Sequence, residues 1–390
     1  MINSIDKISV VHFRHTWGKP TETFLYQYIK NYKKTRPILV GYKRINEELF
    51  PFDCPIVPLY PKWSKARFER SIRYRLNLQE ANKHYNQAKT FKTIREFDVR
   101  LIHAHFGYTG YYALPVQQRT NLPLVTTFYG HDISRMPDIP GWDHKLLELF
   151  EQGDLFLVEG PFMEKRLHEI GCPSQKSGIQ RIAIDCELYP FHIRKPKEKS
   201  KNIEIFFCAS IREKKGLIYA LEAVARAHQH FSNLVFYIAG DGPCRTRIED
   251  KITELKMGSY THLLGFLTHK QMIKEMNTAD IFIQPSVTAQ DGNSEGGAPT
   301  TILEAQACGI PVLATTHADI PYVVVSGTSA LLSPEKDVEA LYNNLMTLLN
   351  FQEMWVSMGR TGREFIEEKH DVHKEVQRLE DRYYQLVNSK

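Results

Sequence analysis

The chain has 390 residues, 42% of them hydrophobic, and its 50 Lys and Arg residues exceed 45 Asp and Glu residues to give a formal charge of +5. The chain is longer than an ordinary domain with a single hydrophobic core, which predicts two domains of roughly 150 to 200 residues. The mild charge argues against a genome-binding protein, and the sequence has no run of about 18 apolar residues that would span a membrane.

The start of the sequence and its cysteines indicate a compartment. Residues 1–13 lack the basic region and long apolar core of a signal peptide, so we expect a cytoplasmic protein. The six cysteines are scattered, without a C-x-x-C pair, which predicts reduced and mostly buried thiols.

In the first half of the chain, short β-rich runs alternate with longer helical patterns. A loop over residues 18–21 and a helix from about residue 22 follow the first strand. The expected strands cover residues 7–13, 36–42, 99–106, 122–130 and 154–160. Continuous apolar strands of this kind are typical of parallel sheets covered on both faces.

The same pattern restarts after residues 189–202, a stretch rich in Lys and Pro that we interpret as a linker. A helix over residues 217–231 follows the first new strand. Strands are expected at residues 203–210, 234–243, 261–267, 280–286 and 311–316, and helical patterns beyond about residue 338. The fold class is therefore α/β, with two Rossmann-like, doubly wound domains.

Residues 294–316 suggest a nucleotide site. Pro299 suits the first turn of a helix, and Gly309 and Pro311 suit its end, which predicts a helix over about residues 299–308. Gly296 and Gly297 let a ligand approach the free N–H groups of the first turn, which can hold an anion.

The helix end cannot bind a nucleotide by itself. It stabilises an anion by about 0.3 to 2 kcal/mol, whereas micromolar binding needs about 8 kcal/mol. Arg212, Lys214 and Lys215 follow the first strand of the second module, where nucleotides bind in open sheets, and would supply the missing positive charge. Glu304, inside the helix, could accept hydrogen bonds from the two hydroxyls of a ribose. Ordinary surface charge is the alternative for all of these residues.

Several motifs in this order resemble the retaining family-4 glycosyltransferases of GT-B fold. They are E-K-K-G at 213–216, G-D-G-P at 240–243, and the pair Glu295 and Glu304 ahead of A-x-A-x-G-x-P-V at 305–312. In the first half, residues 21–25, 102–110 and 126–134 resemble members from bacterial exopolysaccharide and lipopolysaccharide synthesis, including the colanic-acid type.

The resemblance implies two domains that face a cleft. It implies an acceptor domain over residues 1–190, a donor domain over 191–370 and a helix over 371–390 that crosses back to the first domain. The implied reaction moves a hexose from a UDP- or GDP-sugar to a glycan acceptor, such as a polyprenyl-linked oligosaccharide, with retention at the anomeric carbon. No nucleic-acid partner is expected.

The resemblance also implies site residues. Lys215 would contact the diphosphate, Glu304 the ribose and Glu295 the sugar. The candidate catalytic residues are Lys215, Arg212, Glu295 and His131; the candidate donor-binding residues are Gly18, Ser210, Gly265, Gly296, Gly297, Ala298, Thr300, Thr301 and Glu304; the acceptor-side candidates are Lys19, Glu22, Tyr129 and Asp132. Ser210 and Tyr129 stand where the family usually has arginine and histidine.

We expect no cofactor and no metal. The sequence has no Asp-x-Asp pair of the kind that holds a cation on a diphosphate, and Lys215, Arg212 and the helix end would replace the cation. His103 and His105 share one face of a strand end, but without a third ligand in register a cleft or core role is favoured over a metal site.

Residues 62–77 form a basic amphipathic pattern. Six basic residues from Lys62 to Arg75 oppose the single Glu69, so this segment could lie on an anionic membrane surface, which would place the enzyme peripherally on the inner face of the plasma membrane. A basic helix packed on the first sheet is the alternative.

Other function classes share parts of the same sequence pattern. A nicotinamide dehydrogenase is disfavoured because no G-x-G-x-x-G follows the first strand. A nucleotide-sugar epimerase or hydrolase of the same fold, and a non-catalytic partner subunit that resembles a transferase, stay open as alternatives.

Overall fold

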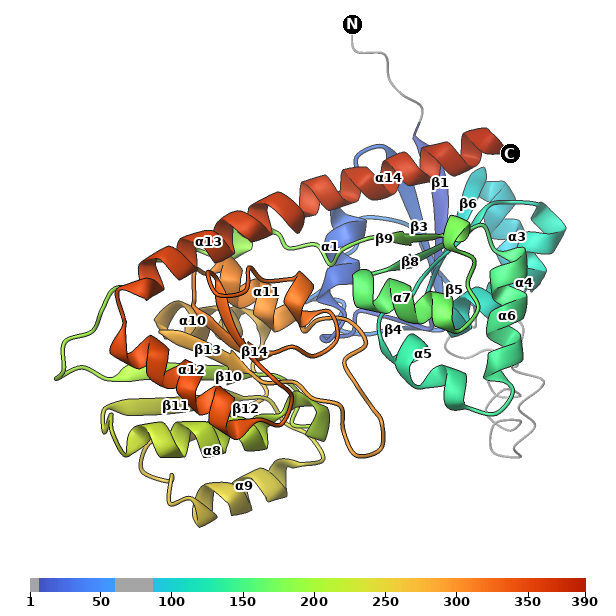
Figure 1. Cartoon of the computed structure of the whole chain (residues 1–390). Coiled ribbons are helices and arrows are strands. Elements are labelled where there is room, and N and C mark those ends of the chain that lie inside the picture. The colour runs from blue at the N-terminus through green and yellow to red at the C-terminus, as the bar shows by residue number, and fades with distance from the viewer. Residues whose placement is uncertain (1–6, 60–86) are drawn as a thin grey trace, which may run out of the picture. The chain divides into compact units, whose positions relative to one another are not determined.

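The computed structural model describes residues 7–59 and 87–390 and divides into two compact units (Figure 1). The first unit contains Met1–Glu159, Met163–Ala183 and Val372–Lys390, and the second contains Gly160–Phe162 and Ile184–Asp371. Each unit is built on one large parallel sheet with helices around it. The predicted α/β class with two doubly wound domains is confirmed.

The sheet of the first unit has seven parallel strands. Their order is β5 (Ile56–Pro58), β3 (Thr35–Gly41), β1 (Ile8–Phe13), β6 (Val99–His105), β7 (Leu124–Thr127), β8 (Leu155–Val158) and β9 (Ser177–Ile179). A small separate pair joins β2 (Thr16–Trp17) to β4 (Lys43–Arg44). The helices are α1 (Thr23–Asn31), α3 (Gln87–Glu96), α4 (Gly107–Thr120), α5 (His131–Ser134), α6 (Trp142–Gln152), α7 (Pro161–Glu169) and α14 (Val372–Ser389).

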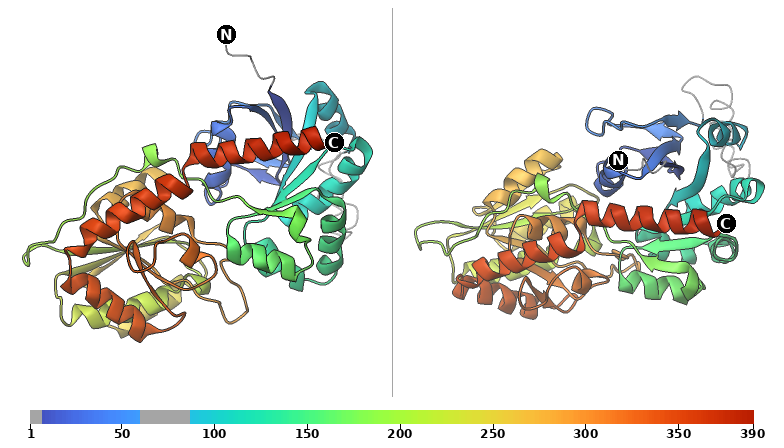
Figure 2. Two further views of the ribbon diagram at one scale, coloured as in Figure 1. Left: turned by 45° about the horizontal axis from the view of Figure 1, so that its top comes forward. Right: turned by 90° about the horizontal axis from the view of Figure 1, so that it is seen from above.

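Both faces of this sheet are buried, as the continuous apolar strands predict. Val11 and Ile102 belong to a core that includes residues of α4 and α6. Their neighbours Val10 and Leu101 point to the opposite face and pack with Tyr28 of α1 and with α14. Figure 2 shows α14, the last helix of the chain, lying along the first unit. The chain's last residues therefore complete the core that its first strand begins.

The sheet of the second unit has six parallel strands. Their order is β12 (Thr261–Gly265), β11 (Leu234–Ala239), β10 (Ile203–Cys208), β13 (Ile281–Gln284), β14 (Val312–Thr315) and β15 (Ala330–Ser333). The helices are α8 (Leu217–His228), α9 (Arg245–Glu254), α10 (His269–Thr278), α11 (Thr300–Ala307), α12 (Val338–Asn350) and α13 (Met354–Lys369).

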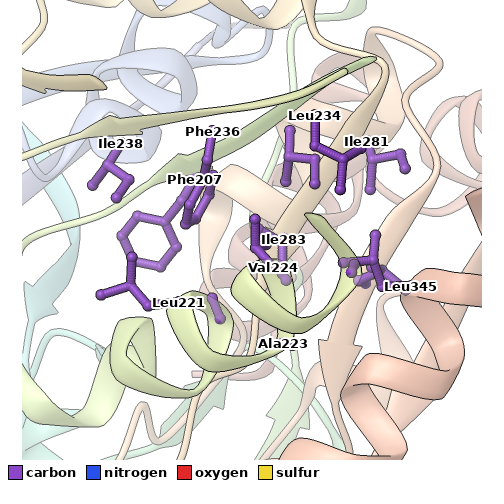
Figure 3. Packing of buried hydrophobic residues seen from close by; sticks show 14 of the residues in the cluster. Phe207, Leu221, Ala223, Val224, Leu234, Phe236, Ile238, Ile281, Ile283 and Leu345 are labelled. Atoms are coloured by element: carbon purple, nitrogen blue, oxygen red, sulfur yellow. The ribbon is translucent and has the colours of Figure 1, made fainter. Parts of the chain in front are cut away.

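One face of this second sheet packs against α8 and α12 (Figure 3). Phe207 and Phe236 come from neighbouring strands, and they face Leu221 and Val224 of α8. Phe206 points to the opposite face, where its ring lies 6.2 Å from that of Phe282. The alternation of large apolar residues along β10 therefore fixes which strand residues face each helix layer.

The strand order creates a switch point between β10 and β13. From β10 the chain moves outward through β11 and β12, then returns to the other side of β10 with β13, β14 and β15. Because all six strands are parallel, their carboxyl ends meet at one edge of the sheet. Ligands of open α/β sheets bind at such a switch point, outside the carboxyl ends of the strands.

The short edge strands β5, β9 and β15 were not among the predicted strands. Among the described residues, no helix has both the length and the hydropathy of a membrane span. The predicted amphipathic segment at residues 62–77 lies outside the described residues.

Candidate functional site

The turn after β10 carries the predicted phosphate-binding lysine. From Cys208 the chain forms a short 3-10 helix, η5 (Glu213–Lys215), and enters α8 through Gly216. Gly216 has φ +68°, and a Cβ there would lie 1.7 Å from the carbonyl oxygen of Pro285, so the position requires glycine. Since Pro285 directly follows β13, this close approach places Lys215 at the switch point of the sheet.

Lys215 forms an ion pair with Glu295 at this edge. Its Nζ lies 2.8 Å from both carboxylate oxygens of Glu295, and the Nζ of Lys214 lies 3.6 Å from one of them. The hydroxyl of Ser286 donates to Glu295 Oε1 at 2.8 Å. The Glu295 side chain is only 7% exposed, so two cations and a hydroxyl hold a buried anion.

These neighbours control the ionisation of Glu295. Burial alone would raise the pKa of its carboxyl, but the attraction of Lys215 and Lys214 and the hydrogen bonds outweigh burial and hold the pKa below its ordinary value. Burial lowers the pKa of Lys214, partly offset by Glu295. At neutral pH the Glu295 carboxylate is therefore ionised, and it could accept hydrogen bonds from sugar hydroxyls.

Two further residues hold the backbone of the same loop. The N–H of Glu295 donates to Nε2 of His317 at 3.1 Å. On the other side of the ring, Nδ1 of His317 lies 2.7 Å from Oε1 of Glu335. Glu335 Oε2 also accepts the N–H of Thr288 at 2.6 Å. Ser286, His317 and Glu335 follow β13, β14 and β15, so three neighbouring strand ends meet around Glu295.

Glu304, the predicted ribose ligand, lies in α11 and is 4% exposed. The hydroxyl of Tyr189 donates to its Oε1 at 2.7 Å and lies 2.7 Å from Nε2 of His269. Burial raises the pKa of the Glu304 carboxyl to about 7, although the hydrogen bond from Tyr189 opposes the rise. Glu304 and Lys215 both act electrostatically on Cys208, whose thiol pKa burial raises to about 12, which places both near the end of β10.

The start of α11 agrees closely with the sequence. The helix begins at Thr300, with Pro299 as its N-cap residue, one residue later than predicted. Gly296 has φ +80°, a conformation that favours glycine, and Gly297 is buried beside the half-buried Ala298. The hydroxyl of Thr301 donates to the side-chain oxygen of Gln284 at 2.6 Å.

The remaining donor-side candidates of the second unit lie at the same sheet edge. Ser210 and Arg212 are exposed in the turn after β10. Gly265 ends β12 with φ +68°, and its carbonyl oxygen accepts the N–H of Gly240 at 2.7 Å. Among the predicted catalytic residues, the side chains of Lys215 and Glu295 form an ion pair, and the N–H of Lys215 donates to the carbonyl of Arg212 at 3.0 Å.

In the first unit, a buried arginine organises the loop after β1. Arg14 is 2% exposed and forms two hydrogen bonds to Glu22, at 2.6 and 3.0 Å. Lys19 Nζ lies 3.2 Å from the same carboxylate. Gly18 has φ +84°, and a Cβ there would lie 2.1 Å from a carbonyl oxygen of Ile45. Glu22, an acceptor-side candidate, is thus already paired with cations.

The candidates after β7 differ in exposure. His131 is exposed, whereas Asp132 is fully buried and accepts the N–H groups of Gly107 at 2.8 Å and Tyr129 at 2.9 Å. Burial raises the pKa of Asp132 to about 6, against these hydrogen bonds. The Asp132 carboxylate thus joins the start of α4 to the turn after β7, and its role as an acceptor-side candidate stays a prediction.

Among the described residues, one group has metal-ligand composition: His12, His103 and His105, all buried, with ligand atoms within 4.8 Å of one another. His12 was not predicted from the sequence to join this group; it pairs in register with His103 across β1 and β6. Five of the six ring nitrogens already form hydrogen bonds; only Nε2 of His12 has none. A cation bound here would have to displace those hydrogen bonds, and the absence of a metal stays a prediction.

Solved structures with the same fold are glycosyltransferases of the GT-B class. HepE of Anabaena, in complex with UDP, superposes with a TM-score of 0.76 and 16% identity, covering 97% of this chain and all of that one. Sucrose-phosphate synthase of Thermosynechococcus elongatus also gives 0.76, with 15% identity over 98% of this chain. The predicted GT-B fold is confirmed.

Sequence relatives decide the family. Residues 189–365 match the family described as glycosyl transferases group 1. A protein named as the colanic acid biosynthesis glycosyltransferase WcaL of Escherichia coli is 32% identical over 277 residues, which are 70% of this chain and 67% of WcaL. The chain belongs to the group 1 glycosyltransferases. The amylovoran biosynthesis glycosyltransferase AmsK of Erwinia amylovora is 30% identical over 72% of this chain and 68% of its own length.

Several residues that contact the candidate site residues of this glycosyltransferase were not predicted from its sequence. Ser286 and His317 each lie within two residues of a predicted strand end, a signal that could have found them. Glu335 follows β15, which was not predicted, and Tyr189 was assigned to the linker although it contacts Glu304. Arg14 follows β1 directly, and its burial beside Glu22 could not be read from the sequence.

Proposed function

We propose that this glycosyltransferase moves a hexose from a UDP- or GDP-sugar to a glycan acceptor during synthesis of a bacterial surface polysaccharide, with retention and without a metal on the diphosphate. The observation that carries the proposal is the buried Lys215–Glu295 pair at the switch point of the second unit. The names of WcaL and AmsK support an exopolysaccharide product, and HepE, which has the same fold, was solved with UDP-glucose.

The cations around the switch point would bind the diphosphate of the donor, and the carboxylate of Glu295 would bind its sugar. A departing diphosphate is an anion, so fixed cations and N–H groups aimed at it lower the barrier. Lys215, Lys214 and Arg212 are the cations of the turn after β10, and the first amides of α11 add a helix end. When the diphosphate competes for Lys215, the carboxylate of Glu295 becomes available to the hydroxyls of the donor sugar.

Glu304 would bind the ribose of the same nucleotide. One carboxylate oxygen accepts the Tyr189 hydroxyl, and carboxylates have about four acceptor positions, so others remain for ribose hydroxyls. Glu304 lies in the helix whose first turn would face the phosphates.

Retention and the acceptor rest on family resemblance. We propose a lipid-linked oligosaccharide as the acceptor and a peripheral position on the inner face of the plasma membrane, in agreement with the basic residues 62–75. The anomeric configuration of the product, read by NMR, tests retention. Liposome pelleting tests the membrane: binding that stays the same after Lys62, Lys65, Arg67, Arg70 and Arg73 are neutralised contradicts it.

A thermal-shift panel tests the donor. UDP-glucose, GDP-mannose and ADP-glucose are each added with EDTA present, and a ligand at 100 times its Kd should stabilise the protein by about 2.7 kcal/mol. Glu304→Gln should weaken the shift, whereas Glu339→Gln, on the exposed side of α12, should leave it unchanged. No shift with any nucleotide sugar refutes the proposal.

The transfer reaction is then followed with the donor that binds. Transfer that persists in EDTA supports metal independence, and loss that Mg²⁺ restores contradicts it. Product analysis separates transfer to an acceptor from epimerisation or hydrolysis of the donor, the two alternatives on the same fold.

A further inference from the structure

We propose that His317 and Glu335 are positioning residues that fix the backbone of Glu295 for sugar transfer. The inference rests on the proposed function, in which Glu295 contacts the donor sugar. Neither residue belongs to a predicted motif, and their side chains come together only because β14 and β15 are neighbours in the sheet.

The direction of each hydrogen bond can be assigned. A backbone N–H only donates, so Nε2 of His317 must be the acceptor of the 3.1 Å bond from Glu295. The ring proton is therefore on Nδ1 and is donated to Oε1 of Glu335 at 2.7 Å. His317 is 2% exposed, so water does not compete for either nitrogen. This relay, Glu295 N–H to His317 to Glu335, requires a neutral imidazole.

Glu335 anchors both ends of one loop segment. Its Oε2 accepts the N–H of Thr288, and its Oε1 holds Glu295 through His317. Burial tends to raise the pKa of Glu335, but the Thr288 amide and His317 outweigh it and hold the pKa below its ordinary value. The ionised carboxylate thus fixes residues 288 and 295 to the end of β15.

The positioning matters during transfer because Glu295 then loses a partner. In this structure Lys215 orients the Glu295 carboxylate. When Lys215 turns to the diphosphate, the Ser286 hydroxyl and the fixed backbone remain to aim that carboxylate. Misplacing a catalytic contact by about 1 Å can cost about 100-fold in rate. The relay should therefore affect kcat far more than nucleotide affinity.

The test compares Glu335→Gln with Glu339→Gln. The two changes are chemically the same, and Glu339 is an exposed residue of α12 paired with Arg226 outside the relay. Glutamine at 335 has one acceptor oxygen where the carboxylate has two, so one of the two anchors is lost. We expect kcat to fall about 10- to 100-fold in Glu335→Gln, with the Kd for UDP within about twofold and Glu339→Gln equal to wild type.

A second pair of variants addresses His317. Gln at 317 keeps an acceptor for the Glu295 amide, whereas Leu removes it. His317→Gln should therefore retain more of kcat than His317→Leu. Equal kcat in Glu335→Gln and Glu339→Gln overturns the proposal, and so does a parallel loss of UDP affinity, kcat and melting temperature, which would mean a purely structural role.

Amide hydrogen exchange provides a readout that needs no substrate. Peptides covering residues 286–296 should exchange faster in Glu335→Gln and His317→Leu than in wild type and Glu339→Gln. If wild type binds no nucleotide sugar, the proposed function fails, and exchange still decides the relay: faster exchange supports anchoring of the loop, and unchanged exchange refutes it.

Discussion

At the level of single residues, the second unit contains two buried glutamates whose pKa values are shifted in opposite directions. Glu295 has two lysines beside it, and these hold its pKa down against burial. Glu304 has a tyrosine hydroxyl, which is neutral, and burial raises its pKa to about 7. The same residue type is thus a fixed anion in one place and a group that titrates near neutrality in the other.

The raised pKa of Glu304 gives a stability that depends on pH. Between its ordinary value of 4.5 and about 7, the folded protein keeps a proton that the unfolded chain has lost, so stability falls as pH rises through this window. The full effect, reached above pH 7, is about 3 kcal/mol at 1.36 kcal/mol per pH unit. Glu304→Gln, which cannot ionise, should therefore be more stable than wild type at pH 8 and similar to it near pH 5, measured by urea unfolding.

Glu339→Gln is the control for this prediction. It makes the same chemical change at an exposed residue of α12, and its free energies of unfolding at the two pH values are the baseline for Glu304→Gln. A Glu304→Gln variant that differs equally at pH 5 and pH 8 would show that the carboxyl titrates normally in the folded protein.

At the level of elements, the tight turn between β10 and α8 sets the geometry of the site. Gly216 lets the turn approach the residue after β13, and the N–H of Val287 donates to the carbonyl of Lys214 at 2.9 Å across the same gap. This backbone contact brings Lys214 and Lys215 within reach of Glu295. A side chain at residue 216 would block the contact.

Gly216→Ala should destabilise the second unit strongly. The new Cβ would lie 1.7 Å from the carbonyl oxygen of Pro285, and φ is +68°, so both a clash and the cost of a left-handed conformation apply. We expect a loss above about 3 kcal/mol, at the severe end for a point change. Gly327→Ala is the matched control, because Gly327 has φ +79° but open space around it, and should cost only about 1 to 2 kcal/mol. Equal losses of unfolding free energy in the two variants, measured by urea unfolding, would contradict the predicted clash.

The predictable elements share a physical basis. The central strands are continuous apolar runs, and Pro299 and Gly309 mark the ends of α11, so local sequence was enough. The edge strands β9 and β15 are three and four residues long, too short for a periodic signal. The contact between His317 and Glu335 depends on the order of strands in the sheet, which the residues themselves do not encode locally.

At the level of the whole molecule, the first unit is built from both ends of the chain. Residues of α14 pack against the same sheet face as Val10 and Leu101. Glu380 of α14 accepts the backbone N–H groups of Lys33, Lys34 and Thr35 with one carboxylate oxygen, at 2.6 to 3.0 Å. The first unit is thus incomplete until the last helix has been made, whereas the second unit is nearly continuous in the chain.

Deletion of residues 372–390 should therefore unfold the first unit and spare the second. The deletion removes Val376, Leu379 and Tyr383, each at most 3% exposed, from the core. It also removes Glu380, which accepts three backbone N–H groups; leaving that of the buried Thr35 unpaired costs about 1 to 3 kcal/mol, a large share of the roughly 5 to 15 kcal/mol stability of a typical domain. Limited proteolysis should then cleave residues 7–59 and 87–183 first, while a fragment near residues 184–371 survives and still binds the nucleotide found for the full chain.

Glu380→Ala should show a milder form of the same pattern, because it removes the amide acceptor and keeps the apolar contacts. If both units of the deleted chain melt at the wild-type temperature, α14 is an accessory to the first unit and the assignment of its core is wrong.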